Sequence, residues 1–179
     1  GETDQTGEAA INAAIAGLPA HGGRVHLTGG SYAIGAVAGT FGGVIIDRSN
    51  VLLTGEGSAT RLRLQDGLTD CNVIWIRGDI EDIGVRDLFI DGNARNQVPW
   101  VRERSQWNGN NGIKIINPAG GTDSAGRYDV TPRNVRVANC HIVDCVLMAV
   151  MAHGTAVEVR DCYFTGSFGS HVIELLGHS

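Results

Sequence analysis

The sequence predicts an all-β fold, a parallel β-helix of about five coils that is closed at one end by an N-terminal capping helix. An internal repeat, an alternation of apolar residues within each copy, and a composition suited to short strands and tight corners lead to this prediction. The chain has 179 residues, of which 26 are glycine, 42% are hydrophobic and 6% are aromatic. These values fit one domain, spanning residues 1–179.

The repeat is clearest near the end of the chain. NVRVANCHIVDC at 134–145 matches AVEVRDCYFTGS at 156–167 with a shift of 22 residues, and IGVRDLFIDGN is an earlier copy. The matched pairs are Val135 with Val157, Val137 with Val159, Asn139 with Asp161, Cys140 with Cys162, and Ile142 with Phe164. One coil cannot bury its own apolar edge, so coils of this kind stack about 4.8 Å apart with like side chains in ladders.

A second strand follows each copy and carries two inward-facing apolar residues one position apart. The pairs are Ile74 and Ile76, Ile113 and Ile115, Val150 and Ala152, and Ile173 and Leu175. Alternation along a strand places the residues between and after them on the outer face. One outward ladder runs Trp75, Lys114, Met151 and Glu174, and the ladder beside it runs Arg77, Ile116, His153 and Leu176. We expect this face to be exposed.

Residues 4–18 are the one segment that predicts a helix. Ile11, Ile15 and Leu18 fall on one face, and Pro19 with the following glycines ends the pattern. Laid across the first coil, this helix would protect an open strand edge. The coils then fill residues 24–179, with an inserted loop at 94–110.

At the C-terminal end the sequence offers no second cap. We therefore expect the last coil to be exposed, to pair with another chain in a homotrimer or end-to-end contact, or to continue in a longer protein.

Charge and cysteine content narrow the classes of partner. The formal charge of −5 argues against a nucleic-acid partner, and the sequence has no apolar run long enough to span a membrane.

The four cysteines form no CxxC pair and are predicted to be reduced and structural. Asp79, Glu81 and Asp82 form an acidic corner that could hold Ca²⁺, although a solvated turn explains it equally well. No cofactor is predicted.

Two segments resemble a known superfamily. TDQTGEAAINAAIAGLPAHGGRVHLTGGSYAI is similar to the opening of the pectate-lyase superfamily of right-handed parallel β-helices, where a TDDT-like phrase, a capping helix and a GG-x-V-x-L-x-x-G-x-Y strand occur in that order. VRDLFIDGNARN resembles the DL-x-x-DGN-x-x-N phrase of secreted alginate epimerases and phage tailspikes. The resemblance implies right-handed coils, an extracellular or virion-surface location, and a function among lyases, hydrolases, epimerases and non-enzymatic spikes.

The chain departs from this family pattern in two places. The strand and FGA-x-GDG phrase that usually precede the TDDT element are missing, which points to a piece of a longer protein. In the epimerases, the strand similar to MAVMAHG carries an Asp and a His two positions apart. Here His153 matches the His, whereas Met151 stands at the Asp position. This difference argues against the epimerase mechanism.

The inserted loop predicts a binding surface beside the outward ladders. It contains Trp100, Arg102, Arg104 and Trp107. Together with Trp75 and Arg77, these residues suit an acidic polysaccharide, because aromatic faces stack on sugar rings and arginine binds carboxylates in a bidentate manner. The alternative is a loop that buries its two tryptophans against the coil and leaves its arginines in solvent.

Lys114, His153 and Glu174 are the candidate catalytic residues. Glycoside hydrolysis normally needs two carboxylates, and this face has one. Elimination or epimerisation of a uronate needs a charge neutraliser, either Lys114 or Arg77, and a base such as His153. The sequence therefore predicts recognition or processing of an acidic extracellular polysaccharide, by a lyase before a hydrolase or epimerase. A non-enzymatic glycan-binding or tailspike segment, and a purely structural β-helix, remain as alternatives.

Overall fold

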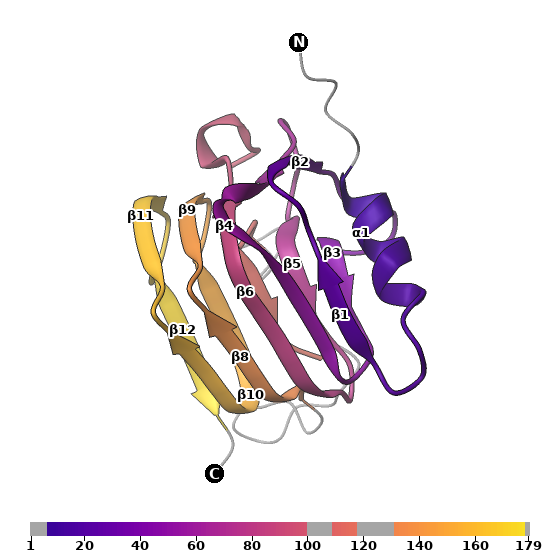
Figure 1. Ribbon diagram of the computed structural model, residues 1–179. Helices are drawn as coiled ribbons and strands as arrows, with labels where there is room; N and C mark the ends of the chain where they lie inside the picture. Colours follow the sequence, from indigo (N-terminus) through magenta and orange to yellow (C-terminus); the bar gives the residue numbers. More distant parts are fainter. Residues whose placement is uncertain (1–6, 100–108, 118–130, 178–179) are drawn as a thin grey trace.

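The computed structural model describes residues 7–99, 109–117 and 131–177, and it confirms the predicted parallel β-helix (Figure 1). Its elements, in chain order, are α1 (Gly7–Ala16), β1 (Gly23–His26), β2 (Gly30–Ile34), β3 (Gly42–Ile46), β4 (Val51–Leu64), β5 (Asn72–Ile76), β6 (Glu81–Asp91), the 3-10 helix η1 (Ala94–Asn96), β7 (Ile113–Ile115), β8 (Arg133–Ala138), β9 (His141–Cys145), β10 (Val150–Arg160), β11 (Tyr163–Phe168) and β12 (Ile173–Gly177). Every pairing between these strands is parallel.

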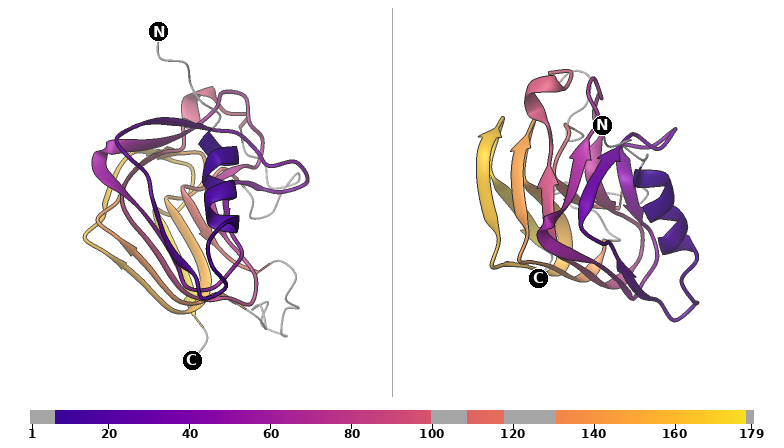
Figure 2. Two further views of the ribbon diagram at one scale, coloured as in Figure 1. Left: turned by 45° about the vertical axis from the view of Figure 1, so that its right-hand side comes forward. Right: turned by 45° about the horizontal axis from the view of Figure 1, so that its top comes forward.

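The strands stack in three rows, which together make five coils in the described part of the chain. Two rows, β1–β4–β6–β8–β10 and β2–β4–β6–β9–β11, form sheet A. The third row, β3–β5–β7–β10–β12, forms sheet B. β10 belongs to both sheets, because its first half pairs with β7 and β12 and its second half with β8. Two further views show the stacked coils with α1 at the end opposite β11 (Figure 2).

The interior is a continuous apolar core built from the predicted ladders. Val135 aligns with Val157, Val137 with Val159, and Ile142 with Phe164, which confirms the 22-residue register. The inward residues of the second strand are fully buried in β5, β7 and β10. In the last coil Leu175 is 50% exposed, because β12 pairs on one side only, with β10.

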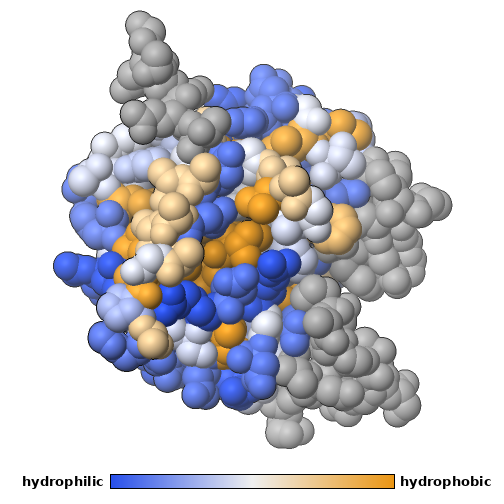
Figure 3. Space-filling model, turned by 90° about the vertical axis from the view of Figure 1, so that its right-hand side faces the viewer, coloured by the Kyte–Doolittle hydropathy of each residue, from blue (hydrophilic) through white to orange (hydrophobic). Residues whose placement is uncertain are grey.

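α1 covers the first coil at the N-terminal end of the stack, the end that faces the viewer in Figure 3. Ile11 and Ile15 are buried under it, as predicted. The Asn12 side chain donates to the Gly43 carbonyl and accepts from the Ile45 amide, so it satisfies the open edge of β3 as a further strand would. Arg48 donates to carbonyls in the last turn of the helix, where a cation is favoured. No helix in the described part of the chain combines the length and apolar character needed to cross a membrane.

The coils turn at columns of residues with left-handed backbone conformation. One column comprises Asn50, Asp82, Asn134 and Ala156, with φ angles of 59°, 59°, 51° and 54°. A second comprises Asp87, Asn139 and Asp161, with φ angles of 59°, 51° and 53°. Asn and Asp enter this region more readily than other non-glycine residues, so the corner residues are selected by backbone geometry. Asn139 Nδ2 also donates to Asp87 Oδ1 at 2.7 Å, which links successive coils.

A buried amide ladder marks the corner before sheet B. Asn72 donates to the Phe41 carbonyl, Asn111 Nδ2 donates to Asn72 Oδ1 at 2.7 Å, and the Met148 amide donates to Asn111 Oδ1 at 3.1 Å. Both asparagines are fully buried. The ladder satisfies backbone groups that the corner removes from strand pairing, and it fixes where each strand of sheet B begins.

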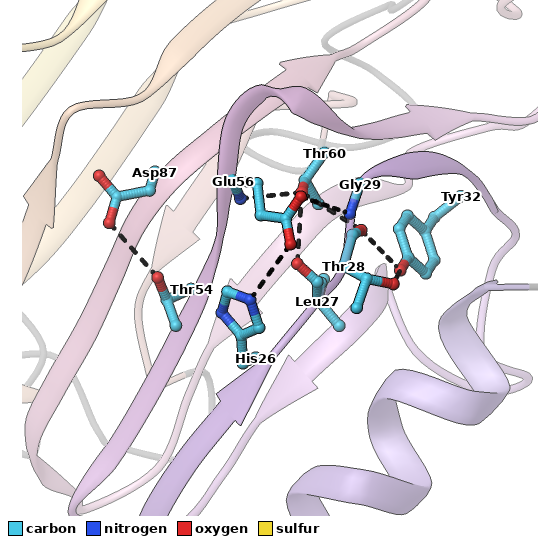
Figure 4. A network of polar contacts seen from close by, with 9 residues as sticks. All are labelled: His26, Leu27, Thr28, Gly29, Tyr32, Thr54, Glu56, Thr60 and Asp87. Carbon is cyan, nitrogen blue, oxygen red and sulfur yellow. Dashed lines mark hydrogen bonds and ion pairs between the residues drawn. The ribbon is translucent and has the colours of Figure 1, made fainter.

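β4 departs from regular pairing between Thr54 and Arg61, and a polar network holds this irregular segment (Figure 4). The Glu56 amide donates to Thr60 Oγ1, and the Thr60 hydroxyl lies 3.3 Å from the Leu27 carbonyl. The Glu56 carboxylate accepts from the Gly29 amide and lies 3.6 Å from His26. These contacts account for the polar groups at the bend, so we assign His26 and Glu56 a structural role.

Candidate functional site

Sheet B brings the predicted outward ladder together in the expected register. Trp75 pairs with Lys114, Lys114 with Met151, and Met151 with Glu174. In the neighbouring ladder His153 pairs with Leu176. The three candidate catalytic residues therefore share one face of one sheet. Lys114 and Glu174 lie on strands two rungs apart, with Met151 between them.

The expectation that this face is exposed was wrong. Trp75 and Lys114 are 3% exposed, Ile116 2%, Met151 0% and His153 8%. The reason is the apolar character of several outward residues, which form two clusters separate from the main core. One contains Ile45, Trp75 and Ile116 with Val37 packed against it, and the other contains Leu147, Met148 and Met151. The alternation of residues along each strand predicts which face these side chains point to. It does not determine how exposed they are to solvent.

Trp75 organises the cations of this face. Its indole N–H donates to the Ile116 carbonyl at 3.2 Å. The Arg77 guanidinium and the Lys114 ammonium lie 5.1 and 5.7 Å from its ring centroid, within range of a cation–π attraction. Arg77 also pairs with Asp47 at 3.6 Å. The ring is covered by these neighbours, so Trp75 orients charged groups and does not offer a free stacking surface.

Phe41 is an aromatic residue of this region that the sequence analysis missed. Its ring centroid lies 6.2 Å from that of Trp75, and the residue is 44% exposed. It offers the accessible aromatic surface that had been assigned to tryptophan. Phe41 directly precedes β3, the strand that pairs with β5, and this position next to Gly42 was the available signal.

His153 and Glu174 form a partly buried pair across adjacent coils. His153 Nε2 lies 3.2 Å from Glu174 Oε1, and their side chains are 10% and 19% exposed. A carboxylate at this distance fixes the orientation of the imidazole ring. The pair therefore has the geometry of an oriented base, and Glu174 is the better exposed partner.

Lys114 lies in a desolvated position. Burial lowers the pKa of its ammonium from 10.5 to about 8, and the nearby negative charge of Asp70 partly opposes that change. Asp70 is itself buried and occupies a left-handed turn before β5. Sequence reasoning missed Asp70, because a turn residue carries no periodic signal. Lys114 is thus a cation that can lose its proton close to neutral pH, a property often found at functional sites.

The remaining predicted residues fall into two groups. Trp100, Arg102, Arg104 and Trp107 lie outside the described residues. At the acidic corner, Arg133 forms ion pairs with Asp79 and Glu81, and Asn134 donates to Asp82. Within the described ranges, no group of three or more His, Cys, Asp or Glu side chains is placed to hold a metal ion.

Comparisons with known proteins relate the chain to alginate-acting proteins. Over 102 residues it is 38% identical to alginate lyase 7 of Azotobacter vinelandii, a match covering 54% of this chain and 12% of the relative. Over 99 residues it is 36% identical to mannuronan C5-epimerase AlgE6 of the same organism, covering 52% of this chain and 11% of the relative. The matches thus span about an eighth of each relative's length. No protein-family model matches the chain.

The structural comparison supports the fold. The AlgE6 A-module of Azotobacter vinelandii superposes with a TM-score of 0.66 and 24% sequence identity, covering 94% of this chain and 46% of the A-module. The AlgE4 A-module superposes with a TM-score of 0.61 and 22% identity, covering 94% of this chain and 49% of that module. The likeness to both modules shows a shared fold.

Proposed function

We propose that this chain, which has the parallel β-helix fold of the pectate-lyase superfamily, recognises or processes an acidic extracellular polysaccharide at the outer face of sheet B. The observation that carries the proposal is the shared outward face on which a desolvated Lys114 lies near the oriented His153–Glu174 pair. The names of the relatives point to alginate, a polymer of uronates, as the substrate. Neither relative is a tailspike, so that alternative is not retained.

Elimination is the reaction that these side chains fit best. Lys114 or Arg77 would pair with the uronate carboxylate and stabilise the negative charge that develops when the adjacent C5 proton leaves. A neutral His153 would accept that proton, with Glu174 holding the imidazole in place. The C5 electron pair then forms the C4=C5 double bond, the C4–O bond breaks, and the leaving oxygen takes a proton from water.

Met151 favours elimination over epimerisation. Epimerisation must return a proton to the opposite face of C5 and therefore needs a second acid at that position. The centre of the ladder holds the fully buried thioether of Met151 between Lys114 and Glu174. Elimination needs no such return of a proton to carbon.

The direction of approach follows from exposure. Of the three candidate catalytic side chains, Glu174 is the most accessible, and it belongs to the last strand of sheet B. We expect a uronate to enter from the β12 side and to reach His153 before Lys114. Phe41 at the other end of the face would contact a sugar ring further along the polymer.

Turnover is tested by incubating the protein with alginate, polymannuronate, pectate and a neutral glucan. An elimination appears as new ultraviolet absorbance from the unsaturated uronate. His153→Ala should abolish this signal while leaving affinity for the acidic polymer nearly unchanged. The matched control is His141→Ala, because His141 lies on sheet A and contacts Thr165 at 2.8 Å. Equal activity of both variants, or neither binding nor turnover with any acidic glycan, would contradict the proposal.

A non-catalytic glycan-binding module is the second candidate. The low exposure of Lys114 and His153 favours it, since a polymer must reach both groups for chemistry. In this case calorimetry would show binding of acidic glycans without any change in absorbance. Arg102→Ala with Arg104→Ala would weaken binding of charged sugars more than that of neutral ones, because bidentate pairing to carboxylate is lost.

A further inference from the structure

A groove lies on the outer face of sheet A, away from the two ladders of sheet B that contain Lys114 and His153. It encloses a cavity of about 460 Å³, within the range of about 300–1,000 Å³ common for ligand pockets. Strands β4, β6, β8 and β10 supply its walls and floor, so four successive coils contribute. The residues that line it include Leu52, Gly84, Arg86, Arg136, Ala138 and Arg160.

The groove arises from small residues placed between arginines in two neighbouring ladders. In one ladder Leu52 pairs with Gly84 and Gly84 with Arg136. In the other, Arg86 pairs with Ala138 and Ala138 with Arg160. Gly84 and Ala138 leave a low apolar floor, and a Cβ built on Gly84 would come within 2.8 Å of Leu52 Cδ1. The Leu52 side chain therefore lies over Gly84, which has no Cβ to clash with it, and forms part of the apolar floor.

Three guanidinium groups border this floor at the spacing of the coils. Adjacent strands lie about 4.8 Å apart, so the backbones carrying Arg86 and Arg160 are separated by roughly 10 Å, with Arg136 on the strand between them. Their side chains are well exposed, at 50% for Arg86, 63% for Arg136 and 57% for Arg160. They can therefore meet a ligand without displacing a packed neighbour.

The ion pairs in the groove leave donors available. Asp87 lies 3.4 Å from Nε of Arg86, and Glu158 lies 3.6 Å from Nε of both Arg136 and Arg160. Asp161 lies closer, 2.8 Å from Nη1 of Arg160. Exposed pairs of this kind contribute little to stability, so a ligand carboxylate can compete with them. A planar guanidinium binds a carboxylate through two parallel hydrogen bonds.

We propose that this groove is a second binding site, specific for a short segment of a carboxylated oligosaccharide. Its arginines would bind uronate carboxylates, its apolar floor would contact the C–H face of a sugar ring, and Asn50 and Asn134 at its edge would bind hydroxyl groups. The class of ligand rests on the proposed function, whereas the location rests on the groove alone. β10 carries both His153 and Arg160, so a polymer held in the groove stays close to sheet B and rebinds there at a raised effective concentration.

The test is calorimetric titration of short oligomannuronates into protein that carries His153→Ala, so that turnover cannot interfere. Adding Arg136→Ala and Arg160→Ala should weaken the binding event that belongs to the groove at least tenfold, while any binding at sheet B persists. Arg61→Ala is the matched control, because Arg61 is an exposed arginine of sheet A that lies over the Phe89 ring, 4.2 Å from its centroid. The control should bind as the parent does. Circular dichroism verifies that each variant is folded.

A conservative variant and two other ligands complete the experiment. Arg136→Lys keeps the charge and loses the planar fork, so its affinity should fall between those of the parent and of Arg136→Ala. A neutral oligosaccharide of the same length should bind weakly and equally to all variants. Unchanged affinity in the double variant, or an equal loss in the Arg61→Ala control, would overturn the proposal. Inorganic phosphate displacing the oligomannuronate at equal concentration would also overturn it, since the groove would then bind anions without reading the sugar.

The groove and the catalytic proposal fail independently. If Arg136→Ala with Arg160→Ala leaves the affinity unchanged while His153-dependent turnover is intact, the groove proposal alone is refuted. Binding that depends on the arginines without any turnover would support the groove proposal and refute the proposed reaction at sheet B.

Discussion

Replacing Lys114 with Met should change the pH dependence of folding stability in a specific direction. Burial holds the pKa of this group at about 8, against 10.5 for an ordinary lysine. Between these two values the unfolded chain carries a proton that the folded protein has lost. Stability should therefore rise as the pH increases from 8 to 10.5, and the charged lysine should destabilise the fold below pH 8.

The size of the effect follows from the same pKa values. A difference of about 2.5 pH units corresponds to roughly 3 kcal/mol, at about 1.4 kcal/mol for each unit. Lys114→Met removes this cost, so the variant should be the more stable protein at pH 7. This figure already includes the attraction between Lys114 and Asp70, which partly offsets the cost of burial.

The assay is urea unfolding of the wild type and the variant at intervals from pH 7 to 10. The stability advantage of Lys114→Met should shrink as the pH rises. Arg77→Met is the control, because arginine does not titrate in this range and its effect should be the same at each pH. Lys114 is the single lysine of the chain, so dimethylation with ¹³C labels only this side chain and the N-terminal amine, and NMR reports its pKa directly. A measured pKa near 10.5, or parallel pH curves for wild type and variant, would refute the reasoning.

Three further predictions concern the coil stack. Val137→Asp puts an unpaired charge into the dry core, costs several kcal/mol and should abolish folding; a soluble variant with unchanged circular dichroism would contradict the register. Iodoacetamide at pH 7.5 should modify Cys162 before the other cysteines. The hydrogen bond to Cys140 lowers the pKa of Cys162 to about 7, whereas burial raises the pKa of Cys71 to about 12. Mass spectrometry of the labelled peptides checks the order of modification. The half-exposed Leu175 in the last coil predicts association through that end, so light scattering should show the mass rising with concentration; a strictly monomeric protein would exclude it.

The stacking register was predictable because its signal is local and repeated. Val135 and Val137 recur as Val157 and Val159, and each apolar residue must meet an equivalent one in the next coil to be buried. The same alternation fixed which residues of β5, β7 and β10 point outward. Asn139 could be recognised as a corner residue because its side chain type suits a left-handed backbone.

The environment of the site could not be predicted in the same way. Burial of Lys114 depends on what packs over the outer face of sheet B, and no period in the sequence encodes such contacts. Asp70 and Phe41 come from turns, whose positions in space depend on the corners of neighbouring coils. The groove on sheet A was missed because each of its arginines belongs to a different copy of the repeat, where a single outward charge is unremarkable.

Comparison of equivalent corner positions within the first left-handed column identifies a stabilising substitution. Three of its four positions hold Asn or Asp, and the fourth holds Ala156 at a φ of 54°. An alanine Cβ in this conformation costs about 1 kcal/mol, which Asn or Gly reduces. Ala156→Gly and Ala156→Asn should each raise the melting temperature by a few degrees, with Asn extending the amide column from Asn134. Internal repeats of this kind can thus guide stabilisation where sequence families would ordinarily supply the consensus.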